Sequence, residues 1–176
     1  MTAAGLRWFA DIAVDAAVVE VGLGGRYDAT NVVDAQVAVV TNIGLDHVEF
    51  IGPTLADIAH EKAGIVRPDS ILVLGETDPA LVPVFERAGA AATWLRDEDF
   101  ACTSSTIAHG GRLLDIRTPG ASYDDVYLPL HGAHQAEAVV IRREHTGVGA
   151  TDAALASFLG KTPVAVLAGL SRRVEI

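Results

Sequence analysis

The fold class follows most directly from TNIGLDHVEFIGPTLADIAHEKAGIV, residues 41–66. It starts at the end of an apolar run, 37–41, crosses a loop, and continues into the clearest helical pattern of the chain, 54–66. Thr54 and Asp57 have the spacing of a capping box, with Asp in place of the preferred Glu. Strand, loop and helix in this order form the repeating unit of an open parallel sheet with helices on its faces.

The runs on either side continue this alternation. The expected elements are a short helix at 3–10, a doubly buried strand at 16–21, a strand at 71–74, a helix at 79–88 and a short strand at 91–94. Near-continuous apolar strands are typical of a sheet covered on both faces. The sequence therefore predicts an α/β fold with a mostly parallel sheet and flanking helices.

After residue 100 the pattern becomes that of a small antiparallel appendage. Residues 103–108 and 112–116 flank a His-Gly-Gly turn and predict a hairpin, and 125–128 predicts a further strand. A helix is expected to begin at His131. Beyond about Arg142 the pattern weakens: 151–159 has a helical character, whereas 163–170 is apolar and leaves the type of element open.

Composition narrows the class of protein. The 176 residues are 50% hydrophobic and 20% charged, which suits a packed domain, and the net charge of −10 argues against a nucleic-acid partner. We expect no membrane partner, because no run reaches the length of a span and the start lacks the pattern of a signal peptide. The single cysteine, Cys102, excludes an internal disulfide and is interpreted as an inert thiol. A cytoplasmic location is expected.

Two residues stand out at the expected carboxyl ends of strands, where ligands bind in open α/β sheets. Glu20 lies inside an otherwise apolar run, and a buried carboxylate is costly unless it is paired or bound to a metal. An ion pair with an arginine remains possible, although the glycines at 22–25 favour close approach of a ligand. His47 follows the 37–41 strand and is either a metal-site residue or a solvated loop residue.

Lys62 is the third anomaly. It falls on the apolar stripe of the 54–66 helix, four residues after Ile58 and three before Ile65. Such a lysine either extends its charged end to the surface or is used chemically. Burial lowers the pKa of an amine, and a neutral amine reacts with CO₂ to give a carbamate that can bind a metal.

Three runs together resemble the central domain of the folylpolyglutamate and dihydrofolate synthases, a branch of the Mur ligase superfamily. They are EVGLGGRYDATN (20–31), the stretch 41–66 and LPLHGAHQAE (128–137), and the similarity covers residues 1–138. The GGRxDATN form distinguishes this folate branch from the peptidoglycan ligases. The resemblance implies that 1–141 is a partial central domain and that 142–176 is either a divergent tail or the start of the linker to an absent C-terminal domain.

The resemblance also assigns roles to residues. It implies that Glu20 and His47 bind Mg²⁺ and that Lys62 is carbamylated, with the carbamate helping to hold a second Mg²⁺. It places a glycine-rich loop near the folate and the phosphates, and the corresponding residues are Gly24, Gly25, Arg26, Asp28, Thr30 and Asn31. His134 and Gln135 correspond to residues that reach the nucleotide, and Arg173 to a phosphate-contacting arginine.

The implied reaction uses ATP and Mg²⁺. ATP phosphorylates the carboxylate of a folate or of dihydropteroate, and the amine of L-glutamate attacks the resulting acyl phosphate. Metal ions would spread the charge on the transferred phosphoryl group.

Two departures from the family pattern leave alternatives open. The N-terminal phosphate-loop unit of the family is missing, and Gly160-Lys161-Thr162 lacks the upstream glycine of that motif and is interpreted as chance. The asparagine expected after the HQ pair is also missing. The chain could thus be a catalytically inactive remnant, or an interaction module that pairs with a complete ligase. Loss of a strand beside the 16–21 strand would bare a sheet edge, which predicts self-association.

Overall fold

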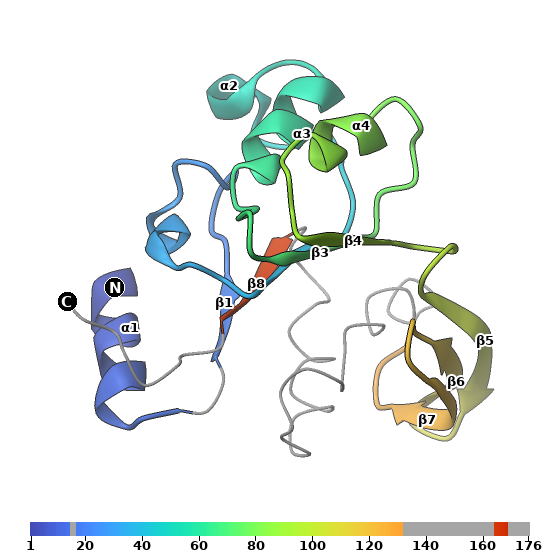
Figure 1. The fold of residues 1–176 in the computed structure, drawn as a ribbon. Helices are drawn as coiled ribbons and strands as arrows, with labels where there is room; N and C mark the ends of the chain where they lie inside the picture. Colours follow the sequence, from blue (N-terminus) through green and yellow to red (C-terminus); the bar gives the residue numbers. More distant parts are fainter. Residues whose placement is uncertain (15–16, 132–163, 169–176) are drawn as a thin grey trace. The chain divides into compact units, whose positions relative to one another are not determined.

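The computed structural model describes residues 1–14, 17–131 and 164–168, which fall into two compact units (Figure 1). The first is built from Met1–Thr93 together with strand β8 (Val164–Ala168), and the second begins at Trp94. The helices expected from His131 and at 151–159 lie outside the described residues. Among the residues that are described, no helix is both long and apolar enough to cross a membrane.

A five-stranded sheet has the order β1-β8-β2-β3-β4, and all of it except the last two residues of β4 belongs to the first unit. The strands in chain order are β1 (Ala17–Glu20), β2 (Val37–Val40), β3 (Ile71–Leu74) and β4 (Ala92–Leu95). Since β1 and β2 both pair antiparallel with β8, they run in the same direction, and β3 pairs parallel with β2. The predicted α/β class is confirmed, and β8 shows that the ambiguous run at 163–170 contains a strand.

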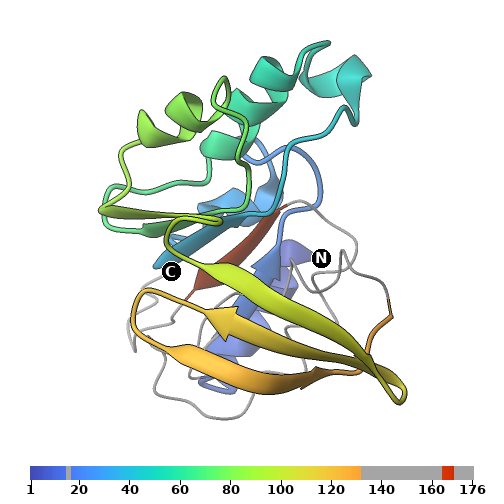
Figure 2. The ribbon, with the colours of Figure 1, turned by 90° about the vertical axis from the view of Figure 1, so that its right-hand side faces the viewer.

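The sheet forms because its strands are apolar on both faces. All four residues of β2 are buried, as are Leu72, Val73 and Leu74 of β3. Helix α3 (Leu55–Ala63) and helix α4 (Val82–Glu86) lie together on one side of this sheet, where Ile58 and Phe85 are almost completely buried (Figures 1 and 2). The apolar stripe predicted for residues 54–66 therefore faces the core.

Local signals set the start of α3. The hydroxyl of Thr54 accepts from the Asp57 amide at 3.1 Å, and the Asp57 carboxylate accepts from the Thr54 amide at 3.1 Å, which completes the predicted capping box. The helix ends earlier than expected, at Ala63, because the following residues Gly64–Val66 continue in tight turns.

The remaining helices differ in detail from the expectation. Helix α1 (Thr2–Asp11) forms as predicted but has no fully buried residue. The predicted 79–88 helix is reduced to α4. Two short elements were not expected, helix α2 (Val48–Ile51) and a 3₁₀ turn, η1 (Ala29–Val32), because four residues are too few to show a period.

The second unit carries the small antiparallel sheet, in the order β5-β6-β7. Its strands are β5 (Ala101–Ala108), β6 (Gly111–Arg117) and β7 (Ser122–Leu128), so the predicted appendage is confirmed. Gly110, with φ of +73°, makes the turn between β5 and β6. Irregularities in both ladders, between Cys102 and Ser104 and between Leu114 and Ile116, mark bulges that the sequence pattern did not reveal.

The prediction of a bared sheet edge concerns the two sides of strand β1. Strand β8 pairs with all four residues of β1, from Ala17 opposite Ala168 to Glu20 opposite Ala165. The side of β1 that faces β2 is therefore not bared. On its outer side β1 ends the sheet among the described residues.

Candidate functional site

The candidate site lies at the carboxyl ends of β1 and β2. Glu20 is the last residue of β1 and lies opposite Ala165 of β8, which in turn lies opposite Val39 of β2. Glu20 is thus level with the end of β2 and two strand spacings away, about 10 Å. This is the edge at which open α/β sheets bind ligands.

Lys62 is buried in α3, with 6% of its surface exposed. Most of the side chain is therefore removed from solvent, in contrast to an ordinary surface lysine. Burial lowers the pKa of Lys62 from 10.5 to about 8, and the negative charge of Asp46 opposes that shift. An amine with this pKa is partly neutral in mildly alkaline solution, and the neutral form is the nucleophile.

Asp46 and His47 occupy the loop between β2 and α2. The His47 amide donates to Asp46 Oδ1 at 2.8 Å, and His47 Nε2 lies 3.6 Å from Asp46 Oδ2. His47 has φ of +50°, and about half of its side chain is exposed, so both side chains are accessible. Asp46 was not identified as a site residue from the sequence, although a carboxylate next to a candidate metal-site histidine was a usable signal.

Residues that follow β3 make hydrogen bonds that fix the loop carrying Asp46. Glu76 Oε2 accepts from the Ile43 amide at 2.9 Å, and the Gly75 amide donates to the carbonyl of Val40 at 2.7 Å. A Cβ on Gly75 would lie 2.1 Å from the carbonyl oxygen of Thr41, so only glycine fits there. Glu76 was not identified from the sequence, because its partner is far away in the chain.

The glycine-rich loop lies directly on the helix that carries Lys62. The Arg26 amide donates to the carbonyl of Glu61 at 3.0 Å, and Gly24 has φ of +68°. A Cβ on Gly25 would lie 2.8 Å from the Glu61 carbonyl oxygen and 3.1 Å from the Cα of Lys62. The glycine therefore allows the backbone of the loop to lie against the turn of α3 that presents Lys62.

Asp28 organises that loop. Its Oδ2 accepts from the amides of Gly22 at 3.2 Å and Leu23 at 3.0 Å, and its Oδ1 accepts from the amide of Thr30 at 2.8 Å. Burial alone would raise the pKa of Asp28, but the hydrogen bonds from Thr30, Leu23 and Gly22 outweigh it, so the pKa lies below its ordinary value. Asp28 and Thr30 therefore shape the loop.

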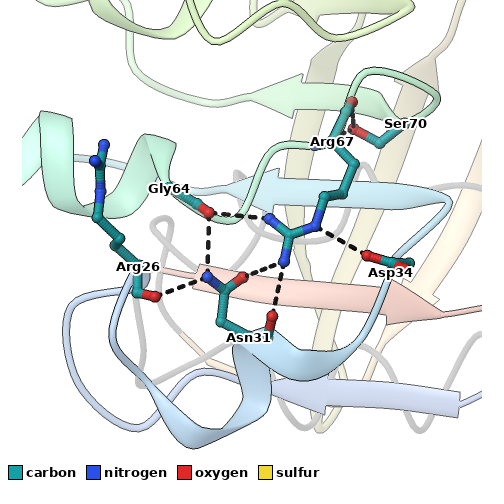
Figure 3. A network of polar contacts seen from close by, with 6 residues as sticks. All are labelled: Arg26, Asn31, Asp34, Gly64, Arg67 and Ser70. Atoms are coloured by element: carbon teal, nitrogen blue, oxygen red, sulfur yellow. Dashed lines mark hydrogen bonds and ion pairs between the residues drawn. The ribbon is translucent and has the colours of Figure 1, made fainter.

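Asn31 ties the end of the loop to the end of α3 (Figure 3). Its Nδ2 donates to the carbonyl oxygens of Arg26 at 2.8 Å and Gly64 at 3.2 Å, and its Oδ1 accepts from Arg67 at 2.9 Å. The side chain of Arg26 points away from this network, and its Nη2 lies 3.4 Å from the carbonyl of His60. Arg67 was not identified from the sequence.

The donors at the strand ends fit one kind of magnesium site. In the described part of the chain, no three His, Cys, Asp or Glu side chains lie close enough together to hold a metal ion. Mg²⁺ commonly uses one or two carboxylates and takes its other oxygens from water and substrate phosphates. Glu20 and Asp46 supply oxygens of that type, so the residues fit a phosphate-shared ion rather than a cage of protein ligands.

The other predicted site residues cannot be placed around this centre. His134, Gln135 and Arg173 lie outside the described residues. Their predicted contacts with the nucleotide stay predictions.

Comparison with known proteins gives consistent matches. The Mur ligase middle domain matches residues 5–141. The chain is 47% identical, over 150 residues, to the dihydrofolate synthase/folylpolyglutamate synthase of Mycobacterium tuberculosis, a match that covers 80% of this chain and 31% of that protein.

Two solved structures share the fold. The folylpolyglutamate synthase of Mycobacterium tuberculosis complexed with ADP aligns with a TM-score of 0.72 and 43% identity, covering 90% of this chain and 34% of that one. An FPGS–AMPPCP–folate complex aligns with a TM-score of 0.74 and 31% identity, covering 77% and 34%. The chain thus spans about a third of the length of the proteins it matches.

Proposed function

We propose, from the premise that this chain belongs to the Mur ligase family through its middle domain, that it is part of an ATP-dependent ligase that joins L-glutamate to a folate or to dihydropteroate. The motifs of the folate branch and the 47% identity to a dihydrofolate synthase/folylpolyglutamate synthase support this function. The relatives complexed with ADP, and with AMPPCP and folate, support a nucleotide and a folate as ligands.

The observation that carries the proposal is the buried Lys62, against which the glycine-rich loop packs and on whose amine the charge of Asp46 acts. In the proposed carbamylation, the neutral amine of Lys62 attacks the carbon of CO₂, a C–N bond forms and a proton leaves to solvent. The product is an anionic carbamate, which suits a Mg²⁺ site that Glu20 and His47 would share. Mg²⁺ there would neutralise the charge of the phosphoryl group that is transferred.

The chain's own residues orient the reactants in this proposal. The glycine loop, shaped by Asp28 and Thr30, offers backbone close to the phosphates and the folate. His134 and Gln135 would contact the nucleotide, and Arg173 a phosphate. The positions of these three residues are inferred from the family resemblance alone.

The direct test is turnover by the 176-residue chain with ATP, Mg²⁺, L-glutamate and either dihydropteroate or a reduced folate. We expect ADP and phosphate to be released only when all components are present. Folded protein that releases no phosphate would contradict the proposal and support an inactive remnant. Turnover that appears only after addition of a separate phosphate-loop segment would instead support an interaction module.

A second test targets Lys62. With ¹³C-labelled bicarbonate, the NMR spectrum should contain a carbamate signal that disappears in Lys62→Met. The chain has only two lysines, so Lys161→Met is the matched control and should keep the signal. A signal that survives in Lys62→Met would contradict carbamylation at this residue.

The alternatives are an inactive remnant and an interaction module, and the turnover test separates them. Residues 1–141 are proposed to be the partial central domain and 142–176 the tail. A cytoplasmic location and self-association through the outer edge of β1 belong to the same proposal.

A further inference from the structure

We infer that Arg67 is a positioning residue, which clamps the end of the glycine loop onto the end of α3 and so sets the loop against Lys62. This inference rests on the proposed function for its catalytic meaning. Arg67 itself does not belong to the set of residues that would touch substrate or metal.

The guanidinium of Arg67 meets four acceptors from two segments (Figure 3). Its Nη2 donates to the carbonyl oxygen of Asn31 at 2.7 Å and to Asn31 Oδ1 at 2.9 Å. Its Nη1 donates to the carbonyl oxygen of Gly64 at 3.1 Å, and its Nε to Asp34 Oδ1 at 3.1 Å. One planar group thus joins the turn after α3 to Asn31, at the end of the glycine-rich loop, and to Asp34, which follows it.

Asn31 completes this set of contacts between Arg67, Asn31 and Gly64, which we call the clamp. While its Oδ1 accepts from Arg67, its Nδ2 donates to the carbonyl oxygens of Arg26 and Gly64. The carbonyl of Gly64 therefore accepts from both side chains, and it lies only two residues beyond Lys62. A Cβ on Gly64 would lie 2.5 Å from the Cβ of Arg26, so the loop and the helix end are in direct contact.

The backbone of Arg67 is itself fixed. Its amide donates to Ser70 Oγ at 3.1 Å, and Ser70 Oγ donates back to the Arg67 carbonyl at 2.8 Å. Ser70 is fully buried at the start of β3, and its carbonyl accepts from the Ala91 amide at 2.9 Å. The clamp is therefore anchored in the sheet.

Lysine cannot reproduce this arrangement. The acceptors lie in directions that match the planar fork of a guanidinium, whereas an ammonium is a compact charge with three tetrahedral donors. The ion pair with Asp34 contributes little to the stability of this arrangement, because the Asp34 side chain is 90% exposed. The geometry, more than the charge, makes the clamp specific for arginine.

The test compares Arg67→Lys and Arg67→Met by residue-resolved amide hydrogen exchange. The reporters are the loop amides of Leu23 and Arg26, and the reference is the Gly75 amide, which bonds to Val40 in the sheet core. We expect both variants to exchange about tenfold or more faster at the reporters, with the reference unchanged. Arg112→Lys is the matched control, because Arg112 also donates twice, to Ser105 Oγ and to the Ser105 carbonyl, in the other unit.

A spectroscopic readout separates positioning from simple stabilisation. With ¹³C at the lysine Cε, the two lysines give two signals, which Lys161→Arg assigns. We expect Arg67→Met, which adds no third lysine signal, to shift the Lys62 signal at fixed pH, and Arg112→Met to leave it in place. A stabilising contact without a positioning role would lower the melting temperature and leave the Lys62 signal unmoved.

Three outcomes overturn the inference: unchanged loop amides, equal acceleration of the loop and the Gly75 reference, or an unmoved Lys62 signal. If Arg67→Lys and Arg67→Met do not fold, Asn31→Asp removes the Nδ2 donors while keeping the acceptors for Arg67, and the same exchange pattern is expected.

Absence of ATP turnover by the unmodified chain would refute the proposed function but would leave the exchange result to decide the role of Arg67. If turnover is present, Arg67→Lys should lower kcat more than it raises KM for ATP.

Discussion

Replacing Lys62 by methionine should stabilise the folded chain at neutral pH, which is unusual for a change in a buried side chain. Lys62 is 6% exposed, and burial lowers its pKa from 10.5 to about 8. A shift of one pKa unit corresponds to about 1.4 kcal/mol, and because solvent still reaches part of the amine, keeping this lysine charged in the folded state costs at most about 3 kcal/mol. Methionine has a similar length and carries no charge, so this cost disappears.

The lowered pKa of Lys62 makes the free energy of unfolding of the natural chain depend on pH. Below pH 8, Lys62 is protonated in both the folded and the unfolded chain, and the full cost is present. Between about pH 8 and 10.5 the unfolded chain still binds the proton and the folded chain does not, so stability rises with pH. The advantage of Lys62→Met, measured against the natural chain, should therefore be largest near pH 7 and should vanish by about pH 10.5.

The assay is urea denaturation at several pH values in buffer freed of CO₂, so that the amine stays unmodified. Arg87→Met is the control, because Arg87 is an exposed cation and should show no such pH-dependent gain. The difference in free energy of unfolding between Lys62→Met and the natural chain is the measured quantity. A loss of stability near pH 7, or a Lys62 amine that titrates near 10.5 by NMR, would refute the argument that burial controls this group.

Three further changes test the local structure. Thr54→Ala should cost about 1 kcal/mol by removing the cap of α3, as measured by thermal melting, and an unchanged melting temperature would contradict the capping box. Asp28→Asn should cost about 1 kcal/mol at pH 7. The cost should shrink as the pH falls through the lowered pKa of Asp28, since the natural chain then loses the charged acceptor too. A cost independent of pH would contradict the role of the Asp28 charge in shaping the loop. Gly25→Ala should cost about 1–3 kcal/mol and shift the NMR signals of Lys62, because its Cβ would lie 3.1 Å from the Cα of that residue. A neutral effect would mean that the loop does not lie on α3.

Much of the fold could be predicted because its signals are local. The apolar runs of β2 and β3, the capping box of Thr54 and the turn at Gly110 each depend on residues within a few positions of one another. The short elements α2 and η1 were not predicted. Each spans four residues, about one turn, which is too few to show a hydrophobic period. The bulges in the small sheet were not visible either, because they depend on the partner strand.

The candidate site was predicted in part. Glu20 and Lys62 were found because each breaks an apolar pattern, and the structure places one at the end of β1 and buries the other. Their proposed roles as metal ligands are not decided by that placement. Glu76 and Arg67 were missed because their partners lie 33 to 36 residues away, and no periodicity marks such a pair.

The sequence by itself determined the family, the alternation of strands and helices, and the presence of a lysine on an apolar stripe. These features follow from local periodicity and from short motifs, which need no knowledge of distant contacts. Only the tertiary structure decided that Lys62 is buried rather than extended to the solvent, that β8 pairs between β1 and β2, and that Arg67 joins the glycine loop to α3. Burial and long-range hydrogen bonds depend on which segments meet in space, and that is settled when the whole sheet and its helices pack together.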